Sequence, residues 1–259
     1  SDLADTGEEF TVEQALMAVM LQSANEMTLA IAEQTSGSVK KFVELMNLKA
    51  RQLGCTNTHF NNPNGLPDEK HYTTANDMAK IARAAWFNPT FRKYCTTGYY
   101  EIPATNKFSE TRYLLNHHKM MSGQAYAYDG VFGGKTGYTE AAGNTLVTFA
   151  RRGNMYLVSV VMQSINGAYS DTKSLLDYGF NNFSRSAIKA KKEICFSCLP
   201  AEKYLIKDYR KCVLFYSMKT PSVALPNDAD TASVKKNYSI QKNPAGRPPL
   251  TINYIFNGH

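Results

Sequence analysis

The sequence predicts an α/β fold of the α+β type, in which helices flank an antiparallel sheet and a small β-rich domain follows. Through about residue 88, apolar side chains recur at the three- and four-residue spacing of amphipathic helices. Two runs rich in Val, Leu and aromatic residues, 144–150 and 155–162, then flank the turn-like segment 151–154, as in a hairpin. Beyond about residue 184, short β-like runs broken by Pro and Asn indicate a second domain.

Four helices are expected before the sheet. The first begins after Thr11, because a threonine side chain can accept a hydrogen bond from a free N–H group of the first turn. A second, apolar-rich helix covers about residues 27–33. The third begins after Ser38 and ends at Gly54, a residue type that commonly follows helices. The fourth begins after Thr74 and ends before the Asn-Pro pair near residue 88.

A fifth helix, from Lys173 to Phe183, is expected to close the first domain. The predicted domains are therefore 1–183, which holds the helices and the sheet, and 184–259, which is β-rich. The β-like runs of the second domain are Glu193 to Cys198, Lys211 to Tyr216 and Leu250 to Phe256.

The composition is that of a globular protein with a basic surface. The 259 residues are 43% hydrophobic and 20% charged, which excludes intrinsic disorder. The net charge is +7, from 29 basic and 22 acidic side chains. The basic residues are scattered and no nucleic-acid-binding motif accompanies them, so no nucleic acid partner is expected. No apolar run is long enough to span a bilayer, and no signal peptide is visible, although exported proteins are usually studied in their cleaved form.

Cysteine usage indicates no cofactor or metal site. The five cysteines are an odd number, so they cannot all pair internally. Cys195 and Cys198 have the Cys-x-x-Cys spacing of redox or zinc motifs, but no second such pair and no His-x-x-x-His accompanies them. They are expected to be strand or turn residues, and Cys55 and Cys95 are expected to lie in packed segments.

Lys135-Thr-Gly137 is the candidate substrate-binding motif. On a strand it presents an ammonium group, a hydroxyl group and a residue without a side chain next to one another. These groups suit the binding of a substrate carboxylate, and the glycine allows close approach to the backbone. A phosphate-binding P-loop is excluded, because that motif needs a glycine where Asp129 stands, a strand before it and a helix after it.

A second short motif, Ser23-Ala-Asn25, lies at a predicted helix junction. In this order, Ser-x-Asn and Lys-Thr-Gly are two of the three motifs of the serine enzymes that react with penicillin. From about Glu8 to Phe183 the sequence resembles the D-alanyl-D-alanine carboxypeptidases among the low-molecular-mass penicillin-binding proteins, which have a β-lactamase/transpeptidase-like fold. The segments that carry the resemblance are Phe10–Leu16, Gln22–Asn25, Asn57–Gly65, His71–Thr74, Gly134–Gly143 and Leu175–Phe180.

The resemblance implies roles for the residues of both motifs. Ser23 would relay protons to the leaving D-alanine, and Asn25 would contact the substrate and the general base. Lys135 and Thr136 would bind the terminal carboxylate of the substrate. The backbone N–H of Tyr138 would be one donor of the oxyanion hole, which stabilises the negative charge of the transition state.

Other polar residues have smaller expected parts. Arg112 is a further candidate for carboxylate binding. His59 and His71 fit turns, and neither they nor His117 and His118 are expected to act in catalysis. The resembling family needs no metal, so no cofactor is expected.

The nucleophile that the resemblance implies, a Ser-x-x-Lys motif N-terminal to Ser23, is not found there. Four matches to the motif follow Ser23 instead, and none is chosen as the nucleophile; they begin at Ser38, Ser170, Ser186 and Ser233. Three explanations are open: a fragment that begins after the nucleophile, an inactive relative that binds peptidoglycan, or a nucleophile supplied by another polypeptide. The fragment is favoured, because the chain also ends just after a predicted strand and shows no terminal amphipathic membrane anchor.

The function that the resemblance implies is that of a serine-type D-alanyl-D-alanine carboxypeptidase at an extracytoplasmic membrane surface. Such an enzyme removes the terminal D-alanine of peptidoglycan stem peptides through an acyl-enzyme, and penicillins acylate the same serine. A β-lactamase is the nearest rival, but no convincing Glu-x-x-Leu-Asn segment occurs, and the second motif is Ser-Ala-Asn rather than Ser-Asp-Asn. The rival from another class is a non-catalytic module that binds stem peptides without turnover.

Overall fold

The computed structural model describes residues 3–165, 167–187, 195–197, 213–215, 222–229, 231–240 and 250–255. The chain divides into two compact units, Ser1–Gly179 and Phe180–His259, and each is described by itself. The predicted domain boundary between residues 183 and 184 stays a prediction.

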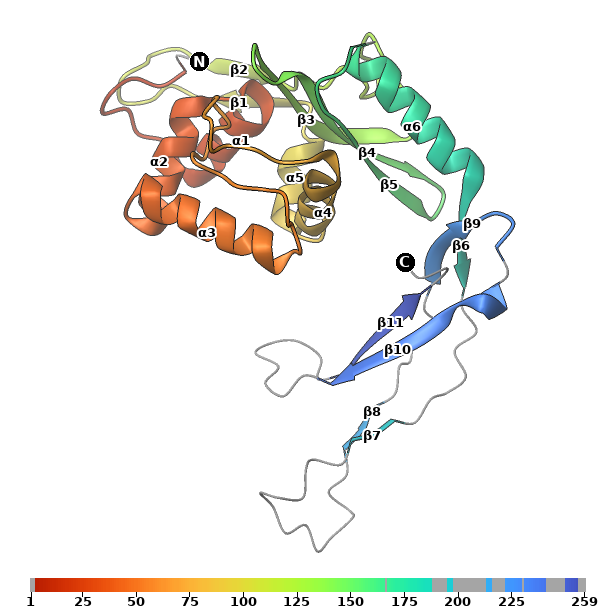
Figure 1. Cartoon of the computed structure of the whole chain (residues 1–259). Helices are drawn as coiled ribbons and strands as arrows, with labels where there is room; N and C mark the ends of the chain where they lie inside the picture. The colour runs from red at the N-terminus through yellow and green to blue at the C-terminus, as the bar shows by residue number, and fades with distance from the viewer. Residues whose placement is uncertain are drawn as a thin grey trace, which may run out of the picture. The chain divides into compact units, whose positions relative to one another are not determined.

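The first four helices lie in the regions that the sequence predicts. They are α1 (Val12–Gln22), α2 (Asn25–Ser36), α3 (Val39–Gln52) and α4 (Ala75–Trp86) (Figure 1). The side chains of Thr11, Ser38 and Thr74 each accept a backbone N–H of the following first turn, which confirms three predicted helix starts. The second helix is longer than predicted, because it begins at Asn25, directly after the Ser23-Ala24 junction.

A short helix and a hairpin that the sequence analysis did not predict follow α4. Helix α5 (Pro89–Thr96) begins where the fourth helix was expected to stop. Proline is favoured at the first position of a helix, and the Asn88 side chain accepts the N–H groups of the first turn, so the Asn-Pro pair starts a helix as well as ending one. The four-residue strands β1 (Tyr99–Ile102) and β2 (Arg112–Leu115) then pair antiparallel.

The central sheet of the first unit is antiparallel, with the order β3-β4-β5. Its strands are β3 (Val131–Thr139), β4 (Gly143–Arg152) and β5 (Met155–Val161), which confirms the predicted hairpin and places the Lys-Thr-Gly motif on a strand. Within the described residues β3 pairs with β4 alone, so β3 forms an edge of this sheet.

Helices cover both faces of the sheet. On one face, here called the α5 face, Trp86 of α4 stacks on Phe149 of β4 with ring centroids 5.2 Å apart, and α5 packs on β3. On the other, the α6 face, Gly179 of helix α6 (Ala168–Asn182) lies against Leu157 of β5. Figure 1 shows α6 running along the sheet, away from α1, α2, α3, α4 and α5. The predicted closing helix, Lys173 to Phe183, is therefore wrong in its start, since the helix begins five residues earlier, at Ala168.

Helix α1 is the centre of the main hydrophobic core. Its side chains Met17 and Leu21 are 2% and 0% exposed, and they pack with Ile102 of β1 and Leu114 of β2. Ala24, directly after the helix, is also fully buried in this cluster. Buried residues before and after the α1–α2 junction, Leu21 and Ala24, thus fix its position relative to the rest of the unit.

The second unit is β-rich in its described residues. Three antiparallel pairs occur: β6 (Phe183–Ala187) with β9 (Ser222–Pro226), β7 (Cys195–Ser197) with β8 (Val213–Phe215), and β10 (Lys235–Ile240) with β11 (Leu250–Ile255). Strands β7, β8 and β11 fall within the three predicted runs. Cys198, the second residue of the Cys-x-x-Cys pair, lies outside the described residues.

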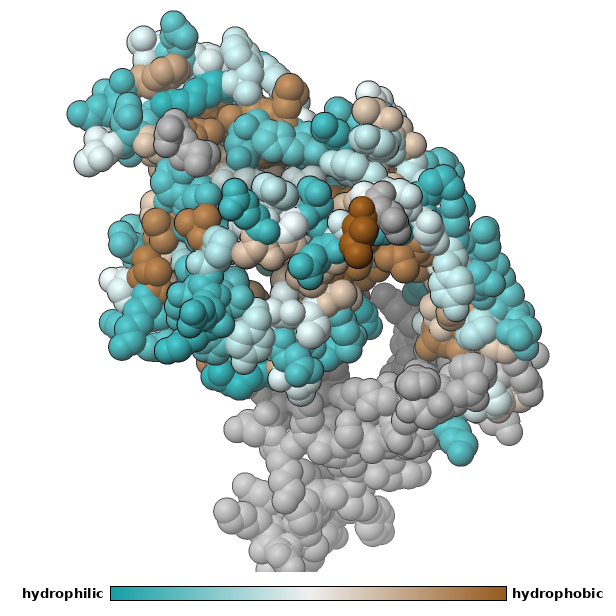
Figure 2. All heavy atoms as spheres, turned by 45° about the horizontal axis from the view of Figure 1, so that its top comes forward, coloured by the Kyte–Doolittle hydropathy of each residue, from teal (hydrophilic) through white to brown (hydrophobic). Residues whose placement is uncertain are grey.

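The surface of the first unit is mainly polar. Figure 2 shows hydrophilic residues over most of the visible face, with a few separate apolar patches. In the part of the chain that the structure describes, none of the helices combines the length and the apolar character needed to span a membrane.

Candidate active site

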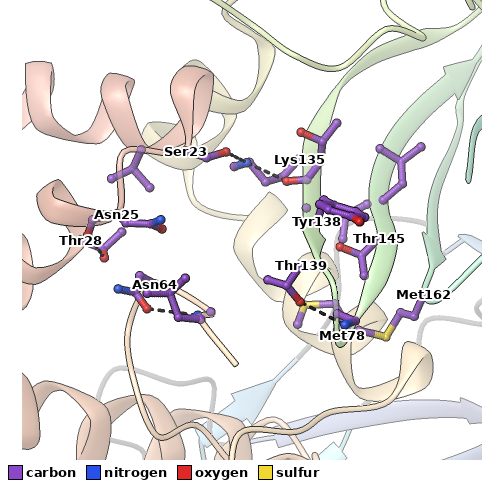
Figure 3. A pocket seen from close by; sticks show the side chains of 18 of the residues that line it. Ser23, Asn25, Thr28, Asn64, Met78, Lys135, Tyr138, Thr139, Thr145 and Met162 are labelled. Atoms are coloured by element: carbon purple, nitrogen blue, oxygen red, sulfur yellow. Dashed lines mark hydrogen bonds between the residues drawn. The ribbon is translucent and has the colours of Figure 1, made fainter. Parts of the chain in front are cut away.

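Ser23 sits at the sharp junction between α1 and α2. Its backbone is left-handed, with φ 57° and ψ 40°, and its N–H donates to the carbonyl of Val19 at 3.2 Å. A residue with a Cβ atom loses about 1–2 kcal/mol in this conformation. The buried neighbours Leu21 and Ala24, both 0% exposed, hold the backbone there. The junction therefore turns the Ser23 side chain out of the helix and toward the sheet (Figure 3).

Lys135 reaches Ser23 from the edge strand β3. Its ammonium donates hydrogen bonds to the Ser23 hydroxyl and, at 2.7 Å, to the carbonyl of Thr136. Burial lowers the pKa of Lys135 from 10.5 to about 8, because the charged form loses much of its hydration. The fold thus joins two residues that are 112 positions apart in the chain by a hydrogen bond.

A pocket of about 440 Å³ opens around this contact. Asn25 and Thr28 of α2 and the loop at Asn64 form one wall, and strand β3 with Tyr138 and Thr139 forms the other (Figure 3). Of all the residues that line the pocket in the described part of the chain, Lys135 is the one with a charged side chain. The pocket therefore offers one positive charge in a neutral surrounding, which suits a ligand with a single carboxylate.

The loop at residues 62–66 holds its own shape. The Asn62 side chain accepts the N–H of Gly65 at 2.7 Å and donates to the carbonyl of Leu66 at 2.9 Å. Asn64 Oδ1 accepts the N–H of Leu66 at 3.2 Å, and Gly65 has a φ of 80° that suits glycine. The turn-forming residues of this Asn-Pro-Asn-Gly segment are visible in the sequence, but no local pattern indicates that they form a pocket wall.

Asp77 of α4 anchors the start of the segment that carries this loop. Its carboxylate accepts hydrogen bonds from Lys80 Nζ at 2.8 Å, the Asn57 N–H at 2.8 Å and the Thr58 hydroxyl at 2.9 Å. The bond from Lys80, joined by the other two, holds the pKa of Asp77 below its usual range. Farther along, Nδ1 of His71 accepts the N–H of Asn61 at 3.1 Å. Asp77 therefore holds the segment before the loop, and the bond between Asn61 and His71 joins the two ends of the loop.

The structure brings all the predicted site residues together. Ser23, Asn25, Lys135 and Thr136 line the same pocket, with Gly137 and Tyr138 beyond them on β3; their individual roles stay predictions. At Gly137 a Cβ atom would come within 2.5 Å of Thr145 Oγ1 on β4, so a side chain there would disturb the strand. The Tyr138 side chain is exposed.

Other candidates lie elsewhere. Arg112 is absent from the pocket lining; it forms an ion pair of 2.8 Å with Glu8 and stacks on Phe108 at 4.0 Å, which accounts for its position. Neither Ser38 nor Ser170, the two Ser-x-x-Lys serines of the first unit, lines the pocket, and the Ser38 hydroxyl instead caps α3. Cys55 and Cys95 are buried, as predicted. Among the described residues, no three His, Cys, Asp or Glu side chains converge as metal ligands.

Comparison with known proteins agrees with this geometry. Residues 2–166 match the sequence family described as D-alanyl-D-alanine carboxypeptidase. The chain is 30% identical over 241 residues to the D-alanyl-D-alanine carboxypeptidase DacF of Bacillus subtilis, covering 92% of this chain and 59% of that protein. It is 35% identical to DacA of Haemophilus influenzae over 198 residues, which are 73% of this chain and 47% of the relative.

Solved structures give the same result. The D-alanyl-D-alanine carboxypeptidase of Mycobacterium tuberculosis superposes with a TM-score of 0.60 at 32% identity, covering 70% of this chain and 72% of that one. A variant of a Streptomyces DD-transpeptidase gives a TM-score of 0.64 at 32% identity, over 69% and 72% of the two chains. The chain spans between 47% and 59% of the two curated relatives named above. By its family match and its relatives, the chain belongs to the D-alanyl-D-alanine carboxypeptidase family.

Proposed function

We propose that the protein is a serine-type D-alanyl-D-alanine carboxypeptidase, which removes the terminal D-alanine from peptidoglycan stem peptides through an acyl-enzyme. The observation that carries this proposal is the hydrogen bond from Lys135 to Ser23 inside a pocket that is otherwise neutral. The names of the relatives support the same substrate class. Penicillins would react with the same site as mimics of the terminal dipeptide.

The substrate would lie along β3. The outer edge of this strand has no partner strand among the described residues, so an extended peptide can add to it through backbone hydrogen bonds. Lys135 and Thr136 then face the terminal carboxylate, and Gly137 allows the peptide backbone to come close. The N–H of Tyr138 would donate to the oxyanion of the tetrahedral intermediate.

Ser23 would carry the proton to the leaving D-alanine. The pKa of Lys135, about 8, leaves the lysine mostly charged at pH 7 yet able to exchange a proton with the hydroxyl beside it. Ser23 and Asn25 line the same pocket as Lys135, so the hydroxyl group can accept a proton from the lysine and face a bound substrate (Figure 3). Asn25 would orient the substrate from the start of α2.

In this proposal the acylated serine belongs to a segment outside residues 1–259. What supports this is the pocket lining, in which Ser23 is the serine present and neither Ser38 nor Ser170, the two Ser-x-x-Lys serines of the first unit, takes part. The protein would act outside the cytoplasmic membrane, where peptidoglycan is found, and it would be held at the membrane surface by a further segment. An inactive protein that binds stem peptides is the alternative that the following experiment separates.

Labelling the purified intact protein with a fluorescent penicillin and mapping the label by mass spectrometry tests the proposed activity. We expect a single labelled serine outside residues 1–259, because acylation needs a nucleophile that these residues do not bring to the pocket. Label on Ser23 would instead make Ser23 and Lys135 a nucleophile–base pair and would contradict the relay role. Binding of a D-alanyl-D-alanine peptide without any label would indicate the inactive alternative.

The affinity for substrate is expected to fall as the pH rises through about 8. Lys135 is charged below its pKa of about 8 and neutral above it, so its attraction for the substrate carboxylate disappears on the alkaline side. We expect KM to rise by roughly tenfold for each pH unit above that value. The variant Lys135→Arg keeps its charge at every accessible pH, so its KM should stay flat over this range. A wild-type KM that is constant from pH 7 to pH 10 would contradict the proposal.

The two variants Ser23→Ala and Ser23→Gly separate the hydroxyl group from the backbone strain. Both remove the proposed relay, and we expect both to slow turnover by roughly 10²–10⁴-fold. Alanine keeps a Cβ atom in the left-handed conformation and glycine does not, so the glycine variant should be more stable by about 1 kcal/mol. Urea unfolding measures the difference. Equal stability would contradict the strained junction, and wild-type turnover in both would contradict the relay.

A further inference from the structure

Two consecutive glycines precede Lys135 on β3, and each lets a different group approach the strand. A Cβ atom at Gly133 would come within 2.5 Å of the carbonyl oxygen of Cys95, which belongs to α5. A Cβ atom at Gly134 would come within 2.1 Å of the carbonyl oxygen of Val147 on the paired strand and within 2.5 Å of the ring carbon Cδ2 of His118. Successive residues of a strand point to opposite faces, so α5 and His118 press on β3 from its two sides.

His118 lies on the α6 face of the sheet, entirely buried. Its exposure is 0%, and its Nε2 is 2.9 Å from the hydroxyl of Thr148, a β4 residue that pairs with Gly134 and is also 0% exposed. The imidazole therefore spans the β3–β4 pair one residue before Lys135. Burial, together with the nearby positive charge of Lys135, lowers the pKa of His118 to about 4, so the ring is neutral at physiological pH.

The segment that carries His118 is itself fastened. The His118 N–H donates to Asn116 Oδ1 at 2.9 Å, and Asn116 Nδ2 donates to the carbonyl of Thr97 at 3.0 Å. The N–H of Asn116 also donates to the carbonyl of Gly98 at 2.9 Å. The residues that follow α5 thus hold the loop from which His118 reaches the sheet.

We propose that His118 is a positioning residue for Lys135: its buried imidazole presses on the backbone of β3 at Gly134 and fixes the strand so that the Lys135 ammonium reaches Ser23. This inference rests on the proposed function only for the effect on the reaction. Strand β3 pairs with β4 along one edge, and its other edge must accept the substrate. Contacts on the two faces of the strand therefore set its position. A displacement of about 1 Å in a reacting group can slow a reaction by roughly 10²-fold.

The test compares His118→Leu, His118→Gln and the control Leu176→Ala in the intact protein. Leucine removes the bond to Thr148, whereas the glutamine amide retains a polar group near Nε2. The control removes a side chain of α6 that is 1% exposed, so it reports on the loss of a buried apolar side chain away from the residues that precede Lys135. The measurements are the rate constant for acylation by a fluorescent penicillin and the amide hydrogen exchange of residues 133–139.

We expect His118→Leu to slow acylation by roughly 10- to 100-fold and to speed exchange in β3 while exchange in β5 stays unchanged. His118→Gln should recover part of the acylation rate and part of the exchange protection of β3. Leu176→Ala should leave the acylation rate within about twofold of the wild-type rate. Wild-type acylation and exchange in His118→Leu, or equal losses in Leu176→Ala, would overturn the inference. If the wild-type protein is not acylated at all, the proposed function fails, and the exchange of β3 alone still decides whether His118 positions the strand.

Discussion

The hydrogen bond between the Lys135 ammonium and the Ser23 hydroxyl joins the two halves of the first unit at the site. One partner stands on an edge strand of the sheet and the other at a junction between two helices. For these groups to meet, the junction must be held by the core and the strand must be held from both faces. The packing of α1 in the core supplies the first condition, and α5 with His118 supplies the second.

Around this contact several local preferences are not met. Ser23 has a left-handed backbone, Lys135 is buried, and β3 carries two adjacent glycines at Gly133 and Gly134, although glycine weakens a strand. Each departure has a cost: the first two place polar groups at the pocket, and the glycines let Cys95 and His118 come close to β3. In most of a protein the local preferences of the residues agree with the fold. Departures from them are expected mainly at functional sites.

Much of the fold could be predicted from the sequence, because its signals are local. Cap residues such as Thr11 and the hairpin turn at 151–154 act within a few residues. Helix α5 is not predicted, because an Asn-Pro pair after a helical pattern indicates the end of a helix, although proline also starts helices. The site residues came from two motifs. The loop at 62–66 has a local turn pattern, but its place in the pocket wall and the contact of His118 with Thr148 depend on contacts across the fold, which no local pattern encodes.

The pKa of Lys135 is the decisive measurement, because the burial of this lysine and its contact with Ser23 underlie the proposed chemistry. It can be measured by NMR titration of protein that carries ¹³C at the lysine ε carbon, with the signal assigned through Lys135→Arg. We expect a pKa of about 8 for this one lysine. A value near the ordinary 10.5 would mean that Lys135 is solvated and that the site is not assembled as described.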